Sequence, residues 1–580
     1  MLVLFGLLIL ATRLPLAPGQ LFTFDDVNLA YSIGHYDIRI SQPHPPGYPL
    51  FVMEMRLLGW LHVKRAESIL LFLALAGSIA ALLMAVHCGN RIFGGDSGLW
   101  AALILWLAPP FWHAGVTSAL RVQLAVISLV VGACCWKAWR GEAAWVRWSA
   151  IALAAGAGIR PETGVLLFPL WAASALRARV NWAERARALG WMAATVLVWL
   201  APAMAASGGP LTFVRANLDY ISDQASVTSG LFGAADSTWL RTFYRLLAWV
   251  FCGTVGLVPA GLLAWRGREG WKVGGERWVF LGLWLLPAFA FALNVHVEDP
   301  GQTLMMVAVV ALLGGYLIER ALDSLGAYVS RWLVASLLAA CCVLAAVWAH
   351  PNDVLHMGWT ELAAVGIALP VKLAPVKNRG WVPRWQAALL VVAPMLYINY
   401  TCFQHRGWYY RGSATGGLAG AAEHAWADIN SGFALTSLEQ IQSTLAVDDH
   451  SLREVRRLIA ERPGRTVVVW ERGLTAWRKV GYYAPDVRMY VLEHKRISGG
   501  APPVIAVWQG AKLLERQEGP GPLRLTLPRE ARIVWMLNPG TEFAGLVSRS
   551  FAAAADGPVS YTDLPAEAGV RNLGEYQVAW

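Results

Sequence analysis

The chain has 580 residues, of which 56% are hydrophobic and only 15% are charged. A soluble globular protein carries roughly 25% charged residues, so this composition excludes an ordinary soluble domain. The formal net charge of +10 would suit a nucleic-acid partner, but repeated long apolar runs and 30 tryptophans instead indicate a polytopic α-helical membrane protein. We expect contacts with membrane lipids and none with nucleic acid.

Apolar runs that resemble membrane spans recur as far as residue 401. About thirteen are predicted, several of them shorter than the roughly 20 residues of a full span. They lie near 1–19, 66–87, 98–112, 120–139, 146–160, 162–178, 188–206, 242–264, 278–295, 302–318, 331–349, 358–374 and 385–401. The first run lacks a basic start and a small-residue cleavage site, so we expect it to be retained as a span.

Basic residues predict how these spans are oriented, because Lys and Arg concentrate in cytoplasmic loops. If the N-terminus is inside, every second loop should be basic. The loops around Arg91, 137–147 and 177–187 are basic, whereas 296–301 and 350–357 contain no Lys or Arg. We therefore expect an integral protein of the bacterial inner membrane with an odd number of spans and its C-terminal region outside.

Two predicted outer loops are long, 20–65 and 207–241. In the first, the apolar stretch from Phe51 to Val63 contains Glu54 and Arg56, which favours an amphipathic helix on the membrane surface over a further span.

The composition changes at about residue 402, where charges of both signs replace the long apolar runs. Two helix-like segments follow, at 448–458 and 474–483, together with strand-like segments at 466–470, 487–492, 503–508, 522–527 and 531–537. They indicate a small α/β or α+β domain. We predict a transmembrane domain over 1–401 and an extracytoplasmic domain over 402–580.

Two adjacent carboxylates, Asp25 and Asp26, follow the first span on the predicted outer side. A carboxylate there could take the proton of an acceptor hydroxyl, position that hydroxyl or hold a metal ion. The alternative is a helix N-cap before Val27, since Asp is a favoured cap, and one Asp could cap while the other reacts.

A stiff loop, His44-Pro-Pro-Gly-Tyr48-Pro49, lies about twenty residues further on. Three prolines restrict its backbone and Gly47 permits a tight turn. The loop could hold His44 and Tyr48 beside the carboxylates, where both become candidates for substrate binding. A simple turn into the interfacial helix is the alternative.

The order of several segments resembles the GT-C superfamily of glycosyltransferases, of the protein mannosyltransferase and aminoarabinose transferase type. The matching segments are Arg13-Leu14-Pro15, Asp25-Asp26, Pro45 to Pro49, Phe51 to Val63, Asn90 to Gly94 and Ala108 to Phe111. The resemblance covers the first two hundred residues, weakens towards 400 and does not involve the C-terminal domain. It implies an integral membrane enzyme that takes a hexosyl or pentosyl group from a polyprenyl-phosphate sugar.

The resemblance also suggests residues for the lipid phosphate. Family members often have a basic residue between the fifth and sixth spans, where this chain has Arg160 and, two residues later, Glu162. Arg in place of the commoner Lys is a departure, and a snorkelling arginine is the alternative. Arg121 and His296 are further candidates for phosphate contacts, although Arg121 could simply pair with an acid. In the loop of His296, Glu298 and Asp299 could instead serve the acceptor, and a polar loop cap is the alternative.

Many relatives carry a second acidic residue in the loop between Trp112 and Val122, and this sequence has none there. The absence puts metal binding through that loop in doubt. No cofactor is assigned, and a divalent metal is left open.

The resulting hypothesis is an inverting glycosyl transfer to a protein, lipid or polysaccharide acceptor on the outer side of the inner membrane. Asp25 or Asp26 would activate the acceptor, and the arginines would stabilise the departing phosphate. A transporter or flippase for a lipid-linked glycan is one alternative, which predicts inverted repeats and ionisable residues at mid-membrane. A non-catalytic scaffold for glycan assembly is the other.

Overall fold

The computed structural model describes residues 1–229, 239–254, 274–325, 431–461, 466–471, 476–493 and 504–518, together with short strands and isolated positions between and beyond them. The chain forms two compact units. Unit 1 is Met1–Pro18 with Tyr48–Gln440, and unit 2 is Gly19–Gly47 with Ile441–Trp580. Unit 2 thus joins the segment that carries the acidic pair to the far end of the chain. The predicted boundary at 401/402 stays a prediction, since the structure describes few residues near it.

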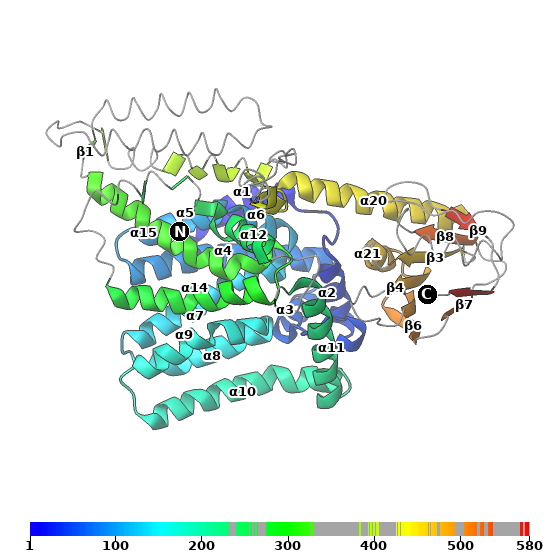
Figure 1. The fold of residues 1–580 in the computed structure, drawn as a ribbon, viewed down its shortest axis with the longest axis horizontal. Coiled ribbons are helices and arrows are strands. Elements are labelled where there is room, and N and C mark those ends of the chain that lie inside the picture. The colour runs from blue at the N-terminus through cyan, green and yellow to red at the C-terminus, as the bar shows by residue number, and fades with distance from the viewer. Residues whose placement is uncertain are drawn as a thin grey trace. The chain divides into compact units, whose positions relative to one another are not determined.

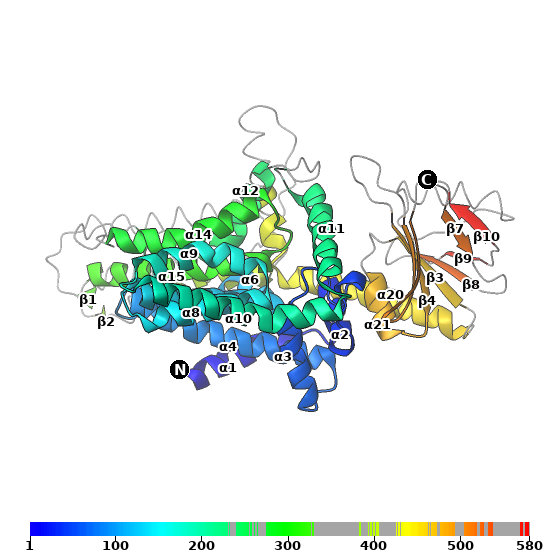
Figure 2. The ribbon, with the colours of Figure 1, turned by 90° about the horizontal axis from the view of Figure 1, so that it is seen from below.

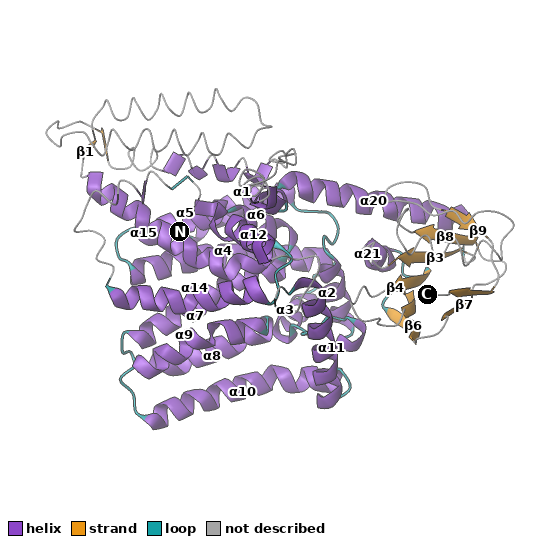
Figure 3. Cartoon of the chain, in the orientation of Figure 1, coloured by secondary structure: helices purple, strands orange, loops and turns teal. Residues whose placement is uncertain are grey.

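The described part of unit 1 is almost entirely helical (Figures 1 and 3). A two-residue pairing of β1 (Tyr328–Val329) with β2 (Val382–Pro383) is the exception among the described residues. The α-helices are α1 (Leu2–Arg13), α3 (Pro49–Trp60), α4 (Ala66–Ile92), α5 (Ser97–Leu107), α6 (Pro109–Thr117), α7 (Ala119–Trp139), α8 (Ala144–Ile159), α9 (Glu162–Arg177), α10 (Trp182–Ala206), α11 (Pro210–Thr228), α12 (Trp239–Phe251), α14 (Gly275–Asn294) and α15 (Leu304–Leu325). Within the unit α8 lies beside both α9 and α10 (Figures 1 and 2).

Several of these helices are long and apolar enough to cross a membrane, which makes the chain an integral membrane protein. Among the described residues there are five, namely α4, α7, α10, α14 and Pro300–Asp323, and a sixth if α5 and α6 form one span bent by 61°. The predicted number of about thirteen spans stays a prediction, because 331–349 and 358–374 lie outside the described residues. The predicted outer loop 207–241 contains helix α11.

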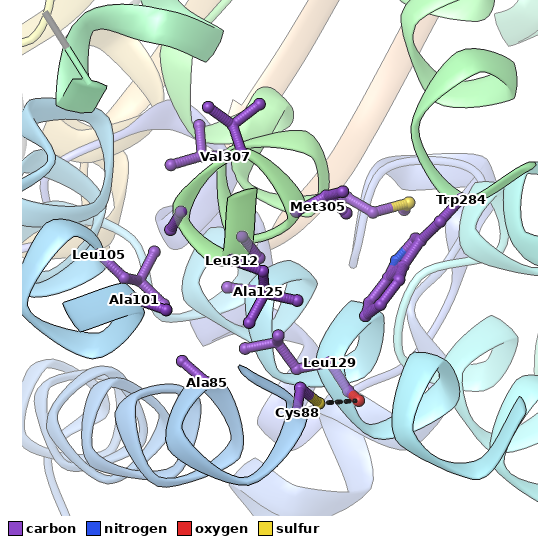
Figure 4. Packing of buried hydrophobic residues seen from close by; sticks show 14 of the residues in the cluster. Ala85, Cys88, Ala101, Leu105, Ala125, Leu129, Trp284, Met305, Val307 and Leu312 are labelled. Atoms are coloured by element: carbon purple, nitrogen blue, oxygen red, sulfur yellow. Dashed lines mark hydrogen bonds between the residues drawn. The ribbon is translucent and has the colours of Figure 1, made fainter. Parts of the chain in front are cut away.

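Small residues and tryptophans pack the helices of unit 1 closely (Figure 4). Gly89 of α4 faces Gly98 of α5, where a Cβ on either residue would collide with backbone atoms of the other helix. Close backbone approach of this kind is typical of membrane helix pairs. Trp284 is fully buried, and its indole N–H donates to Ser128 Oγ at 2.8 Å. Satisfying that N–H inside the core lets a large ring be buried without an unpaired donor.

Helix α3 has the two faces expected of a helix at a membrane surface. Phe51 and Met55 are buried, whereas Met53, Leu57 and Trp60 are 51%, 54% and 76% exposed. An exposed apolar stripe beside a packed face is what an interfacial helix presents to lipid. The structure therefore has a helix where the sequence predicted an amphipathic one.

The buried side of α3 also contains a carboxylate, Glu54. Burial raises its pKa from 4.5 to about 7, and its Oε2 has no hydrogen-bond partner among the described residues. Below pH 4.5 the Glu54 carboxyl is protonated in both the folded and the unfolded state, so its ionisation does not lower the free energy of unfolding. Between pH 4.5 and 7 the folded state holds more protons than the unfolded state, so the free energy of unfolding falls as the pH rises. Above pH 7 the total loss amounts to about 3 kcal/mol.

We expect Glu54→Gln to raise the thermal unfolding midpoint in detergent at pH 8 and to change it little at pH 5, because the amide removes the cost of burying the ionised form. Differential scanning fluorimetry of both proteins at the two pH values measures this difference. An equal shift at both pH values would show that ionisation of Glu54 does not limit stability.

Unit 2 is built around a mixed β-sheet. Its described residues form six strands in the order β6-β5-β4-β3-β8-β9, with β3 parallel to both β4 and β8 and the other neighbours antiparallel. The strands are β3 (Thr466–Glu471), β4 (Arg488–Glu493), β5 (Val504–Gln509), β6 (Lys512–Glu518), β8 (Arg532–Met536) and β9 (Gly569–Arg571), and β7 (Leu523–Thr526) pairs with β10 (Glu575–Val578).

Helices α20 (Leu438–Glu461), α21 (Ala476–Tyr483) and α2 (Phe24–Gly34) complete the unit. Side chains from α20, α21 and the strands form one apolar cluster, in which Val455, Trp470 and Met489 are fully buried. Phe24 and Ile40, from the N-terminal segment, pack against the same cluster. The 19–47 segment is therefore part of the core of this unit and not a loop lying free of it.

Candidate functional site

The two adjacent carboxylates have different surroundings. Helix α2 begins at Phe24, with Thr23 as its N-cap. The Asp26 amide donates to Thr23 Oγ1 at 3.0 Å, and the Thr23 amide donates to Asp26 Oδ2 at 2.9 Å. This reciprocal pair is a capping box, which satisfies two otherwise unpaired amides of the first turn. Asp26, only 2% exposed, thus stabilises the start of the helix.

Asp25 faces a histidine. Its side chain is 32% exposed, and its Oδ1 lies 3.5 Å from Nδ1 of His44, which is buried. Both carboxylates also sit in the first turn of α2, where the helix dipole favours negative charge. A partly exposed carboxylate oriented by an imidazole can accept a proton from a hydroxyl that approaches it. Of the two aspartates, Asp25 is the one whose surroundings suit that chemistry.

The turn that holds His44 depends on Gly47. The Gly47 amide donates to the His44 carbonyl at 3.1 Å, which closes a tight turn. Gly47 has φ +112°, and a Cβ there would collide with the hydroxyl of Tyr36. Only glycine meets both demands without displacing the loop. The turn closed at Gly47 thus includes His44, whose Nδ1 lies 3.5 Å from Asp25 Oδ1.

A second group of predicted residues gathers in unit 1 around Arg160. Arg160 ends α8 in an extended conformation immediately before Pro161, and only 5% of it is exposed. Its Nε pairs with Glu162, and its guanidinium carbon lies 6.0 Å from the centre of the Tyr48 ring. Tyr48 is itself 3% exposed and caps the start of α3. The structure thus brings together three of the residues that the sequence singled out.

Arg160 has an unused donor. Its Nη1 is buried and has no hydrogen-bond partner among the described residues. A buried donor without a partner costs free energy on the order of 1–3 kcal/mol, more for a charged group. An oxyanion would remove this cost through a charge-assisted hydrogen bond. The group is therefore suited to binding phosphate or carboxylate.

Arg121 and His296 lie in a third group, also in unit 1. Arg121 Nη2 is 2.7 Å from Asp299 Oδ2. Asp299 in turn accepts from the Gly301 amide at 2.6 Å and so caps the short 3₁₀ helix η4 (Pro300–Thr303). The side-chain nitrogens His296 Nε2 and Gln302 Nε2 lie 3.3 Å apart. Arg121 therefore has the acidic partner that the sequence analysis gave as its alternative role.

Each predicted residue falls in one unit or the other. Asp25, Asp26 and His44 belong to unit 2, and Tyr48, Arg121, Arg160, Glu162 and His296 belong to unit 1. Within the described part of the chain, no group of three or more His, Cys, Asp or Glu side chains could hold a metal ion.

Sequence reasoning missed Thr23 and the pairing of Asp299 with Arg121. Thr23 completes the capping box, which a Thr three residues before Asp26 would have signalled. Asp299 supplies a carboxylate beside Arg121 from a distant loop. No local pattern could have paired positions that are so far apart in the sequence.

No protein-family model matches the sequence, and no curated protein is significantly similar to it. Solved structures do match its fold. The crystal structure of ArnT from Cupriavidus metallidurans in the apo state is 16% identical, covers 100% of this chain and 97% of that chain, and superposes with a TM-score of 0.51. ArnT from the same organism bound to undecaprenyl phosphate is 15% identical, covers 100% of this chain and 96% of that chain, and gives 0.49.

The arabinosyltransferase EmbB from Mycobacterium smegmatis is 14% identical, covers 70% of this chain and 42% of that chain, and gives a TM-score of 0.43. The apo ArnT structure matches along the full length of both chains. The chain therefore has a GT-C-like membrane fold, as its sequence motifs predicted.

Proposed function

We propose that the protein is a membrane glycosyltransferase that moves a sugar from a polyprenyl-phosphate donor to a hydroxyl acceptor on the outer face of the membrane. The GT-C-like fold along the whole chain supports this class. The observation that carries the chemistry is Asp25, a partly exposed carboxylate whose Oδ1 lies 3.5 Å from the ring of His44. Neither a transporter nor a scaffold requires a carboxylate oriented in this way.

The proposed reaction is a single displacement. Asp25 takes the proton of the acceptor hydroxyl as its oxygen bonds to the anomeric carbon of the sugar. The bond from that carbon to the phosphate oxygen breaks at the same time, which inverts the anomeric configuration and releases polyprenyl phosphate. The role of His44 is to orient the Asp25 carboxylate towards the acceptor.

The leaving phosphate gains negative charge as the bond breaks. A cation that meets this developing charge lowers the barrier, provided that it is already in place. Arg160 is the residue that we assign to it, because its buried Nη1 lacks a partner among the described residues and Glu162 holds the guanidinium. The outer face, the donor class and the assignment of each residue are parts of this proposal.

The proposal is tested with the purified full-length protein in proteoliposomes. Undecaprenyl-phosphate hexose and undecaprenyl-phosphate pentose, each labelled in the sugar, are supplied with an extract of envelope lipids, polysaccharides and proteins. We expect loss of one donor, release of undecaprenyl phosphate and transfer of label to an acceptor. A flippase would instead move the intact donor between leaflets, and a scaffold would leave both donors in place. Either result would overturn the proposal.

A further inference from the structure

The segment that carries Asp25 is attached to the C-terminal part of unit 2 through a buried arginine, Arg478 of α21. Arg478 is only 1% exposed. Its Nε donates to Asn28 Oδ1 at 3.0 Å, and its Nη2 donates to the Ile40 carbonyl at 3.3 Å. Asn28 lies on α2 within one turn of Asp25. A single guanidinium therefore ties together the acidic helix and the loop that follows it.

Aromatic rings enclose the same guanidinium. Its carbon lies 4.6 Å from the centre of the Tyr31 ring, 5.4 Å from Trp477 and 4.3 Å from Trp508. Tyr31 is on α2, whereas the two tryptophans belong to α21 and β5. Each ring face attracts the cation through its quadrupole, and the attraction is stronger where water is excluded. The rings thus hold the cation between the acidic helix and the sheet.

Two further hydrogen bonds anchor the ends of the 19–47 segment. The Leu21 amide donates to Tyr483 Oη at 2.9 Å, and the Gln42 side chain donates to the Ala511 carbonyl. Arg478 binds the segment between these two points, at Asn28 and Ile40. The segment is consequently held near both ends and by Arg478, whose contact at Asn28 lies three residues from Asp25.

A buried arginine is a costly way to stabilise a fold. Removing the charge from water carries a large desolvation cost, and well-packed apolar replacements of buried ionic groups are often as stable. The pKa of Arg478 is lowered by burial to about 10, so it remains charged at neutral pH. An apolar side chain lacks the planar guanidinium group, whose nitrogens donate to Asn28 and Ile40 at the same time.

We propose that Arg478 is a positioning residue, which holds α2 in the orientation that presents Asp25 to the acceptor. The C-terminal domain then takes part in the reaction by fixing the loop that carries the proton acceptor. This inference rests on the proposed function. The C-terminal domain, to which the family resemblance does not extend, would thereby have a role in catalysis.

The test compares variants of two neighbouring buried cations on α21. Arg478→Met removes the fork, and Arg478→Lys retains a charge with a single donor centre. Lys479→Met is the matched control, since Lys479 is also buried but pairs with Asp448 of α20, at 2.6 Å, and not with the acidic segment. Asn28→Ala breaks the Arg478 contact from the other side.

Two measurements are made on each full-length variant. Hydrogen–deuterium exchange is followed over α2 and, as an internal reference, over β4. The kcat and KM for the donor are measured in the transfer assay. For Arg478→Met and Asn28→Ala we expect exchange over α2 to accelerate at least about tenfold with β4 unchanged, and kcat to fall about tenfold at constant KM. This fold-change corresponds to about 1.4 kcal/mol.

The lysine variant should lie between wild type and Arg478→Met, whereas Lys479→Met should change kcat less than about threefold. Unchanged exchange over α2 in Arg478→Met would overturn the inference, as would faster exchange without loss of kcat. Equal effects of Arg478→Met and Lys479→Met on exchange and on kcat would show that Arg478 only stabilises the domain in general. That result would also overturn the inference. If wild type transferred no sugar, the proposed function would fail, and the exchange arm alone would still show whether Arg478 holds α2.

Discussion

Replacement of Asp25 by Asn should lower the kcat for glycosyl transfer by about 10²–10⁴-fold, the usual contribution of a positioned general base. Asparagine has nearly the shape of aspartate but does not accept the proton at neutral pH. The KM for the donor should change little, because Asp25 is assigned to the acceptor. Initial rates at varied donor concentration, measured in proteoliposomes, give both constants.

Asp26→Asn is the matched control for this prediction. Asp26 is 2% exposed and completes the capping box with Thr23, so its replacement should act on the fold. We expect it to destabilise unit 2 by about 0.5–1 kcal/mol, because the amide still accepts from the Thr23 amide but loses the favourable charge at the helix start. Asp25→Asn should lower the thermal midpoint less than Asp26→Asn, because Asp25 is 32% exposed and takes no part in the capping box.

The opposite pattern would reassign the chemistry. A slow Asp26→Asn beside a fast Asp25→Asn would make the capping residue the proton acceptor. Wild-type turnover in both variants would remove the acidic pair from the mechanism altogether. Comparing the rates with the unfolding midpoints keeps loss of chemistry separate from loss of structure.

The helices of unit 1 could largely be predicted from the sequence. The apolar run at 66–87 corresponds to α4 (Ala66–Ile92), and the run at 120–139 to α7 (Ala119–Trp139). A helix that is surrounded on all sides by lipid or by other helices must be apolar on all its faces. Its position can therefore be predicted from the local composition of the sequence. The break between α8 and α9 was also visible locally, since Pro161 disfavours a helical conformation at Arg160, the residue that caps the end of α8.

The edge strand β6 (Lys512–Glu518) could not be recognised in the same way. Its sequence contains Lys, Arg and two Glu, which mask the alternation of a half-buried strand. Charged side chains on an edge strand discourage pairing with another chain. The same charges interrupt the alternation of apolar and polar residues by which a strand is recognised in the sequence.

The attachment of residues 19–47 to the C-terminal region was beyond local reasoning too. It depends on Arg478, and arginine is among the residues least expected in a core. Its partners Asn28 and Ile40 carry no signal for such a contact. Of the candidate site, the His44 loop could be predicted because its prolines and Gly47 act locally, whereas the separation of roles between Asp25 and Asp26 required the capping geometry.

Replacement of Arg160 by Met should raise the dissociation constant for undecaprenyl phosphate by about 10–150-fold, which corresponds to the 1.5–3 kcal/mol typical of hydrogen bonds to charged groups. The buried Nη1 of Arg160 has no partner among the described residues, so a phosphate oxygen would gain a bond that nothing else supplies. Arg160→Lys should recover part of the affinity, because an ammonium offers charge without the planar fork.

Ligand-induced thermal stabilisation measures this affinity without any need for the sugar or the acceptor. A ligand at 100 times its dissociation constant stabilises the folded state by about 2.7 kcal/mol, and this stabilisation should largely disappear in Arg160→Met. Arg177→Met is the control, since Arg177 lies at the other end of α9, is half exposed and pairs with Glu276 at 2.7 Å.

Undecaprenol, which has the same chain without the phosphate, separates the headgroup from the lipid tail. If Arg160 binds the phosphate, undecaprenol should stabilise wild type and Arg160→Met equally. If both proteins instead respond equally to undecaprenyl phosphate, the unpaired donor of Arg160 serves another acceptor. The leaving group of the proposed reaction would then have to be stabilised by a different cation.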